Sequence, residues 1–103
     1  MLPVVMDHLI GEKPERWGRM ADLARAAGVD TTGKSPEEAA RAARDAVAGL
    51  IDTLGLPRRL RDVGADEADF DEVAAAAMGD LVVAFSPVTV NKDDVVSLLR
   101  QAY

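Results

Sequence analysis

The chain has 103 residues, of which 49% are apolar and 29% are charged, and these values are typical of one globular domain rather than of a disordered segment. Eighteen acidic and twelve basic residues give a net charge of −6, which disfavours nucleic acids and anionic membrane surfaces as partners. The absence of cysteine excludes disulfides, zinc-thiolate sites and thiol nucleophiles.

The first segment, residues 1–10, is apolar on nearly every side, with Asp7 and His8 as its polar residues. It lacks the positive start and the small-residue cleavage pattern of a signal peptide, and no other segment approaches the length of a transmembrane helix. A helix that is apolar all round is usually buried. We therefore expect this helix to dock into something larger. The side chains expected at this docking surface are Leu2, Val5, Met6, Leu9 and Ile10.

Two amphipathic helices are predicted next. Apolar residues at helical spacing indicate the first over residues 14–27. Ser35, Pro36 and Glu38 then match a capping box, which predicts the start of the second helix. The residues expected on the buried stripe of this second helix are Ala39, Ala43, Ala46, Val47, Leu50, Ile51 and Leu54.

The long helix is predicted to end sharply within residues 52–64, which read Asp-Thr-Leu-Gly-Leu-Pro-Arg-Arg-Leu-Arg-Asp-Val-Gly. Gly55 can adopt the left-handed conformation that closes a helix, and Leu56 can fold back on the last turn. Pro57 prevents the helix from resuming. We refer to residues 52–64 as the hinge segment.

The remaining chain is predicted to form two helices separated by a loop. Asp66 or Asp69 is expected to cap the first of them, with Phe70, Val73, Ala74, Ala77 and Met78 on its inner face. Residues 81–90 are rich in β-branched residues but lack a partner strand and contain Pro87, so we expect an extended loop. Asn91 and Asp94 predict the start of the last helix. The expected fold is all-α: a single domain over residues 1–103, built as a compact bundle of about five helices with the extended loop before the last one.

Residues 28–35 match a phosphate-binding pattern by letter, because they have the order Gly, four residues, Gly-Lys-Ser. Their context argues against that function. A phosphate-binding loop follows a buried strand, whereas an amphipathic helix precedes this segment. Pro36 also removes a donor N–H, and Asp30 would place a carboxylate among the phosphates. Residues 28–35 are better interpreted as the end of one helix, a loop and the start of the next helix.

Metal binding is also disfavoured. The acidic residues between 66 and 72 lack the glycine and the final glutamate of a calcium loop, and acids are favourable at a helix start through the helix dipole. His8 is the only histidine, and one imidazole cannot build a metal site without several further ligands. We therefore expect no catalytic, metal-binding or cofactor-binding residue in this chain.

The hinge segment closely resembles a signature of the iron-containing (group III) alcohol dehydrogenases, Leu-Gly-(Ile/Leu)-Pro-x-x-Leu-x-(Asp/Glu)-x-Gly, which lies in their C-terminal helical domain. Residues 1–6 (Met-Leu-Pro-Val-Val-Met) resemble the family's Leu-Leu-Pro-His-Val-Met, and residues 98–103 resemble its closing Leu-Leu-x-x-Ala-Tyr. The resemblance keeps the family's order over nearly the whole chain. The departures are Val4 for His, His8-Leu9 for Phe-Asn, Ser86 for Asn and Val88 for Arg.

This resemblance implies a larger enzyme. The family has an N-terminal nucleotide-binding α/β domain, a helical C-terminal domain and a divalent metal, iron or zinc, held by an aspartate and three histidines. All of these ligands would lie upstream of Met1. The chain would therefore be the C-terminal helical portion of a cytoplasmic, metal-dependent, NAD(P)-linked alcohol or aldehyde oxidoreductase, inactive by itself.

The resemblance also suggests a local role and a partner. Val82, Val83 and Phe85 fall where the family's loop approaches the substrate cleft, so they could form an apolar wall. The expected partner is a protein that carries the nucleotide-binding half, as in a split or truncated enzyme, or a second copy of the chain in a homo-oligomer. The alternative is a stand-alone, non-catalytic helical interaction module derived from the same fold.

Overall fold

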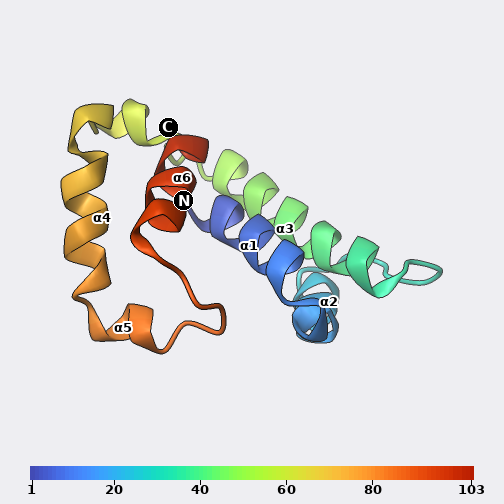
Figure 1. Cartoon of the computed structure of the whole chain (residues 1–103). Coiled ribbons are helices and arrows are strands. Elements are labelled where there is room, and N and C mark those ends of the chain that lie inside the picture. The colour runs from blue at the N-terminus through green and yellow to red at the C-terminus, as the bar shows by residue number, and fades with distance from the viewer. The chain divides into compact units, whose positions relative to one another are not determined.

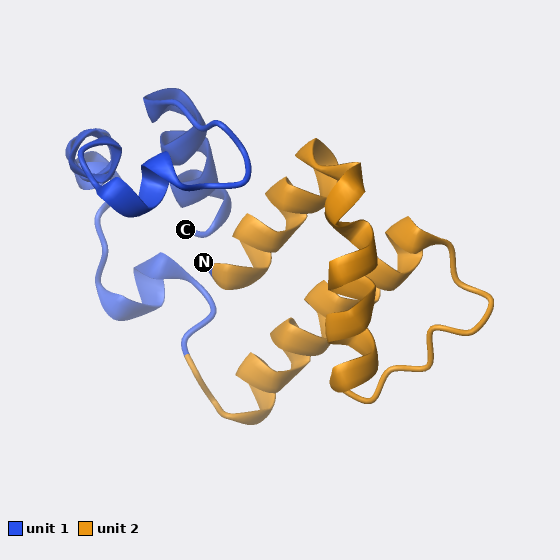
Figure 2. Ribbon diagram, turned by 90° about the horizontal axis from the view of Figure 1, so that it is seen from below, with its two compact units in different colours: residues 1, 57–103 blue, residues 2–56 orange.

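The computed structural model describes residues 1–103 and divides into two compact units (Figure 2). Unit 2 contains residues 2–56, and unit 1 contains Met1 together with residues 57–103. Every regular element is helical, with six α-helices, three short 3-10 helices and no strand. The all-α fold predicted from the sequence is confirmed.

Unit 2 is built on one long helix against which two shorter helices pack. Its elements are α1 (Leu2–Glu12), the 3-10 helix η1 (Pro14–Arg16), α2 (Trp17–Ala26) and α3 (Pro36–Thr53). Both α1 and α2 contact α3 (Figure 1). The helices therefore form where capping and helical periodicity predict them, except that the first turn of the second predicted helix is a 3-10 turn.

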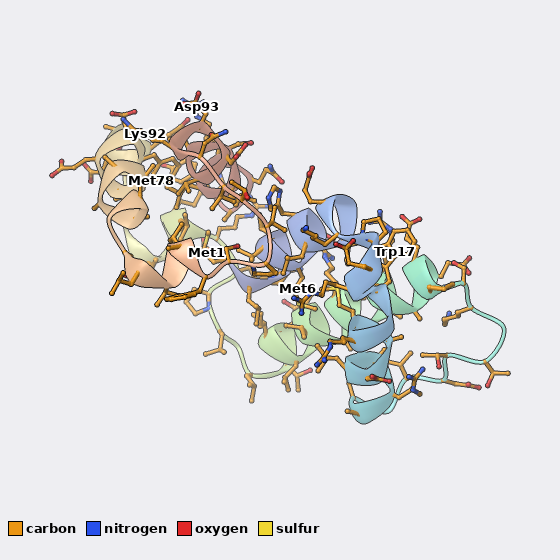
Figure 3. The ribbon with its side chains drawn as sticks, turned by 60° about the horizontal axis from the view of Figure 1, so that its bottom comes forward. Met1, Met6, Trp17, Met78, Lys92 and Asp93 are labelled. Carbon is orange, nitrogen blue, oxygen red and sulfur yellow. The ribbon has the colours of Figure 1, made fainter.

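The core of unit 2 joins one residue from each helix. Met6 of α1, Ala24 of α2 and Ala43 of α3 form a buried cluster, and Met6 is labelled in Figure 3. Ala24 and Ala43 are fully buried. Because alanine carries only a methyl group, the helices can approach closely at these positions.

The end of α1 is fixed by a second contact. Ile10 is 1% exposed and is the largest fully buried side chain of the protein. The indole N–H of Trp17 donates a hydrogen bond of 2.8 Å to the backbone carbonyl of Ile10. Trp17 thereby satisfies one of the carbonyls at the helix end, which would otherwise lack a partner.

An ion pair also links α1 to α3. The guanidinium of Arg44 lies 2.9 Å from the carboxylate of Asp7 and 3.1 Å from that of Asp45. The Arg44 side chain is 32% exposed, so this pair is only partly screened by solvent.

The buried stripe of α3 differs from the prediction in its last turns. Leu50 and Leu54 were expected inside but are 58% and 61% exposed. Small residues fill the interior instead. The buried residues of α3 are Ala39, Ala40, Ala43 and Ala48.

Both ends of α3 follow the predicted chemistry. The Ser35 hydroxyl accepts a hydrogen bond of 3.2 Å from the Glu38 backbone N–H, and the Glu38 carboxylate accepts one of 2.7 Å from the Ser35 N–H. At the other end Gly55 has φ +65°. The Leu56 N–H then donates to the Ile51 carbonyl at 3.1 Å, which closes the helix.

The capping box predicts a pH effect. The hydrogen bond from the Ser35 backbone lowers the pKa of Glu38 below its ordinary value of 4.5. A lowered carboxyl pKa stabilises the folded state above the unfolded pKa, and this contribution disappears as the pH falls through the folded pKa. The Glu38→Gln variant keeps a capping side chain but does not titrate. We therefore expect the unchanged chain to lose more stability than this variant between neutral pH and a pH well below 4.5, measured by urea unfolding. Equal losses in the two chains would contradict the prediction.

Unit 1 contains the remaining helices. They are η2 (Leu60–Val63), η3 (Glu67–Asp69), α4 (Phe70–Met78), α5 (Leu81–Ala84) and α6 (Lys92–Gln101). The main contact of the unit is between α4 and α6, which lie side by side in Figure 1. The ammonium of Lys92, labelled in Figure 3, is 2.8 Å from the Asp71 carboxylate and ties the two helices together at the surface.

An aromatic pair joins the start of α4 to the C-terminal end of the chain. The rings of Phe70 and Tyr103 meet edge to face, with centroids 5.6 Å apart and an interplanar angle of 82°. The Arg61 guanidinium lies 6.0 Å from the centre of the Tyr103 ring. The Leu60 N–H donates to the Ala102 carbonyl at 2.9 Å, which ties the hinge segment to the end of the chain. The buried residues of unit 1 are Phe70, Ala74, Val88, Leu98, Leu99 and Ala102.

Acidic residues between 66 and 72 cap a helix of unit 1 and form an ion pair within it. Asp66 caps η3 by accepting the Ala68 N–H at 3.0 Å, and Glu67 pairs with Arg100 at 3.5 Å. The predicted capping box of α6 is present, since Asn91 and Asp94 exchange side chain to backbone hydrogen bonds. Two residues expected on the inner face of α4 are partly outside, since Val73 is 47% and Met78 is 40% exposed.

The segment before α6 differs from the predicted extended loop. Residues 81–84 form the short helix α5, and only the remainder of the segment is a loop. The Asp80 carboxylate starts α5 by accepting the Val82 N–H at 2.8 Å. The β-branched residues of this segment concealed the helix, because their intrinsic helix propensity is low.

Candidate functional site

The most exposed apolar side chains of the protein lie on one short helix. Leu81 and Val82 of α5 are each 76% exposed, and Phe85, which caps α5, is 83% exposed. Large apolar side chains are ordinarily covered, and an exposed group of them is typical of a contact surface. The apolar residues of α5 are therefore the first candidate for function.

A hollow lies beside these residues within unit 1. It has a volume of about 230 Å³, and the half-buried Val83 is one of the residues that line it. Ser86 shapes the wall of the hollow, because its hydroxyl accepts the Val88 backbone N–H at 3.3 Å. The lining residues are Met78, Val83, Ala84, Ser86, Val88, Thr89 and Val90.

The charge pattern sets this region apart. Residues 81–91 contain no charged side chain and form the longest uncharged run in a chain that is 29% charged. Depletion of charge is a feature of the buried centre of protein interfaces. We use the name α5 surface for Leu81, Val82, Phe85 and the adjacent hollow.

The predicted wall residues are divided between two parts of the α5 surface. Val82 and Phe85 are exposed, whereas Val83 contributes to the hollow. Leu81 was not named by the sequence interpretation, although it is as exposed as Val82. The signal that identifies Leu81 is the uncharged run that begins with it.

The predicted docking residues on α1 have different environments. Leu2 is 56% exposed, and Val5 and Leu9 are half-buried. Met6 and Ile10 are 5% and 1% exposed, because they face the interior of unit 2. Docking through α1 stays a prediction, and Leu2 is its most exposed member.

The possible metal ligands of this chain are scattered over the structure. No three His, Asp or Glu side chains come together in a group that could hold a metal ion. The half-buried His8 has a buried Nε2 without a hydrogen-bond partner, and the neighbouring Asp7 is paired with Arg44. The residues of this chain therefore form no ligand group for the metal, whose ligands the family resemblance places upstream of Met1.

The segment that resembles a phosphate-binding loop has another structure. Gly28 and Gly33 have φ +84° and +76°, and they shape the turns that lead from α2 to α3. The Asp30 carboxylate accepts the Thr32 backbone N–H at 2.9 Å, and this hydrogen bond lowers the pKa of Asp30.

A shallow hollow of about 230 Å³ lies beside this loop in unit 2 and includes Arg25 and Lys34 in its lining. Arg25 is paired with Asp22, and Glu38 occupies the backbone N–H of Ser35 at the start of α3. Carboxylates already occupy the Arg25 guanidinium and the Ser35 N–H, which disfavours a phosphate in this hollow.

None of the helices combines the length and the apolar character that crossing a lipid bilayer requires.

The whole chain matches the model of the Fe-containing alcohol dehydrogenase family, C-terminal part, over residues 1–103. It is 35% identical to 1,3-propanediol dehydrogenase from Citrobacter freundii and 36% identical to lactaldehyde reductase from Escherichia coli strain K12. Both similarities cover 100% of this chain and 26% of the relative. The chain thus spans about a quarter of the length of these relatives.

Solved structures give the same result. The crystal structure of a 1,3-propanediol oxidoreductase matches 99% of this chain and 26% of its own, with a TM-score of 0.88 and 36% identity. The alcohol dehydrogenase from Oenococcus oeni matches 100% of this chain and 26% of its own, with a TM-score of 0.87 and 36% identity. The similarity predicted from the hinge segment therefore extends to both sequence and fold.

Proposed function

Because the chain belongs to the Fe-containing alcohol dehydrogenase family, as its C-terminal domain, we propose that it is the helical portion of a metal-dependent, NAD(P)-linked alcohol or aldehyde oxidoreductase. One observation carries the proposal: the similarity covers every residue of the chain at 35–36% identity to proteins named as dehydrogenases or reductases. The alternative of a non-catalytic interaction module gains no support from these matches.

The reactive groups of this enzyme belong to other residues. The chain has no cluster of His, Asp and Glu that could hold a metal, and its all-helical fold offers no strand for a dinucleotide-binding motif. Metal and nicotinamide therefore come from the polypeptide that corresponds to the other three quarters of the relatives. This polypeptide is either joined to the chain or a separate protein of the cytoplasm.

The contribution of this chain to the reaction is to shape the site. Val82, Val83 and Phe85 carry no titratable group, so their role is to exclude water from the substrate and to contact its apolar part. These three residues form the apolar wall of the substrate cleft when the enzyme is complete. We propose that the two units act together as one C-terminal domain, and a single family model that spans both supports this.

A chimera tests the proposal. In it, this chain replaces the matching quarter of the E. coli lactaldehyde reductase. We expect the purified chimera to bind a divalent metal and to reduce aldehydes with NADH or NADPH, measured by metal analysis and by loss of absorbance of the reduced cofactor. The same reductase without its last quarter serves as the control and is expected to be inactive. A soluble chimera that holds metal but does not turn over any aldehyde would contradict the proposed function.

The isolated chain provides the complementary measurement. We expect it to bind neither nicotinamide cofactor nor iron or zinc, because it lacks a group of ligands for either. Equilibrium dialysis of the 103-residue chain against each ligand measures this directly. Saturable binding of one ligand per chain would contradict the assignment of the metal and cofactor sites to the rest of the enzyme.

A further inference from the structure

We propose that Met78 is a redox-sensitive site, at which hydrogen peroxide oxidises the thioether to the sulfoxide and thereby loosens the segment that follows, residues 80–90. Met78 is the last residue of α4 and is labelled in Figure 3. This reactivity is a property of the chain itself and does not require the proposed function.

Met78 is the accessible methionine within the helices of this protein. It is 40% exposed, whereas Met6 is 5% exposed and Met20 is half-buried against the core cluster of unit 2. Met1 is as exposed as Met78 but precedes the first helix, so its oxidation alters no packed segment. Because a peroxide must reach the sulfur atom, Met78 is the helical methionine that we expect to react first.

Met78 also belongs to the inner stripe of α4. It follows Phe70 and Ala74 at intervals of four residues, and residues with this spacing share one face of a helix. Phe70 is 4% exposed and Ala74 is fully buried, so the stripe is covered until it reaches Met78. Met78 therefore occupies a packing position that an oxidant can still reach.

The hollow beside α5 gives an oxidant room at this position. Met78 is one of the residues that line the hollow, whose volume of about 230 Å³ is several times the roughly 30 Å³ of one water molecule in the liquid. A molecule of hydrogen peroxide fits into this space. Val83 and Val88 line the same hollow, and Val88 is 7% exposed and anchors the loop before α6. A chemical change at Met78 thus acts on the packing of residues 80–90.

The reaction is an oxygen-atom transfer that needs no reactant besides the peroxide. A lone pair of the Met78 sulfur forms the S–O bond while the O–O bond of hydrogen peroxide breaks. A proton moves between the two peroxide oxygens, and water leaves. The sulfur loses two electrons and the peroxide gains them. The product is a polar side chain, and methionine sulfoxide reductases convert it back to the thioether.

The sulfoxide disturbs the hollow because it places a strong hydrogen-bond acceptor among apolar side chains. Such an acceptor is unfavourable there without a partner, so it draws water or the Ser86 hydroxyl toward it. The Ser86 hydroxyl accepts the Val88 N–H at 3.3 Å, which is longer than an ordinary hydrogen bond, and we expect this contact to weaken first. Residues 80–90 should therefore open more often in the sulfoxide form than in the thioether form.

The reactivity is tested by peptide mapping. The 103-residue chain is treated with hydrogen peroxide, quenched at intervals, digested with trypsin and analysed by mass spectrometry. Trypsin places Met20 and Met78 on separate peptides, and fragmentation distinguishes Met1 from Met6. We expect Met78 to be oxidised about tenfold or more faster than Met6, because a buried sulfur reacts only when the structure opens. Oxidation of Met78 at the same rate as Met6, or more slowly, overturns the proposal.

The structural consequence is tested by hydrogen exchange on the chain oxidised at Met78. We expect the amides of residues 80–90 to exchange about threefold or more faster than in the untreated chain. Met78→Leu keeps an apolar side chain of similar volume but removes the sulfur, so peroxide should not change exchange in this variant. Met20→Leu is the matched control and should retain the full response to peroxide.

Reversal gives an independent check that does not rely on a variant. Incubation of the oxidised chain with methionine sulfoxide reductases and a thiol reductant should restore the original exchange rates of residues 80–90. Unchanged exchange after oxidation of Met78 overturns the proposal. The same holds for a rise in exchange that persists in Met78→Leu or that survives the reductase treatment, because its cause would then lie outside Met78.

Discussion

The Ile10→Ala variant is expected to lower the free energy of unfolding by about 2–5 kcal/mol, one of the two largest effects for a single substitution in this chain. Ile10 is the largest fully buried side chain, and its truncation leaves a cavity at the end of α1. The loss is at the upper end of this range if the neighbouring Trp17, which donates to the Ile10 carbonyl, cannot move into the space. Urea unfolding followed by circular dichroism measures the change.

A matched control lies on the same helix. Leu2 is of similar size but 56% exposed, so Leu2→Ala should change the free energy of unfolding by about 0.5 kcal/mol or less in the isolated chain. Similar losses for Leu2→Ala and Ile10→Ala would show that α1 does not face the core through Ile10.

The Phe70→Ala variant is expected to destabilise unit 1 by about 3–5 kcal/mol. Phe70 is 4% exposed and meets the Tyr103 ring edge to face, so the substitution removes both buried apolar area and an aromatic pair. The same denaturant experiment applies, and hydrogen exchange at α4 and α6 should rise with the loss of stability.

Phe85→Ala is the control for this variant, since it is the same substitution in the same unit at 83% exposure. We expect it to leave the isolated chain within about 0.5 kcal/mol of the original stability. Equal effects of the two substitutions in the isolated chain would mean that α5 packs against the core, which would also remove the basis for the α5 surface.

The helix ends were predictable from the sequence because they depend on local chemistry. Each capping box joins two residues that are three positions apart, Ser35 with Glu38 and Asn91 with Asp94. Such short-range contacts can be predicted from the sequence alone. Gly55 belongs to the same class, since a glycine that can adopt a positive φ, followed two residues later by a proline, is a local signal for the end of a helix. The family was recognisable for a similar reason, because its hinge signature is a contiguous string.

The burial pattern was less predictable because it depends on which elements are present to cover each face. The helical period of α3 places Leu50 and Leu54 on an apolar stripe, but both are more than half exposed. In the same way, the apolar character of residues 1–10 could not reveal that Met6 and Ile10 face the chain's own interior. Which of these apolar side chains are buried depends on contacts between residues far apart in the sequence.

The candidate site was identified in part. Val82, Val83 and Phe85 were named from the family resemblance, whereas Leu81 and the short helix that presents it were not. The low helix propensity of valine concealed α5, and the cap from Asp80 that starts it is a single side chain contact. A search for long uncharged runs in a highly charged chain would have found the whole segment from the sequence.

The distribution of aromatic residues gives this protein two built-in optical reporters. Its single tryptophan, Trp17, is in unit 2, and its single tyrosine, Tyr103, is in unit 1. Long-wavelength ultraviolet excitation selects the indole, whose emission is sensitive to loss of the hydrogen bond to Ile10. The near-ultraviolet signal of the phenol reports instead on its contact with Phe70. Whether the two units melt as one cooperative body or in succession can thus be read from the unlabelled chain by comparing two spectra.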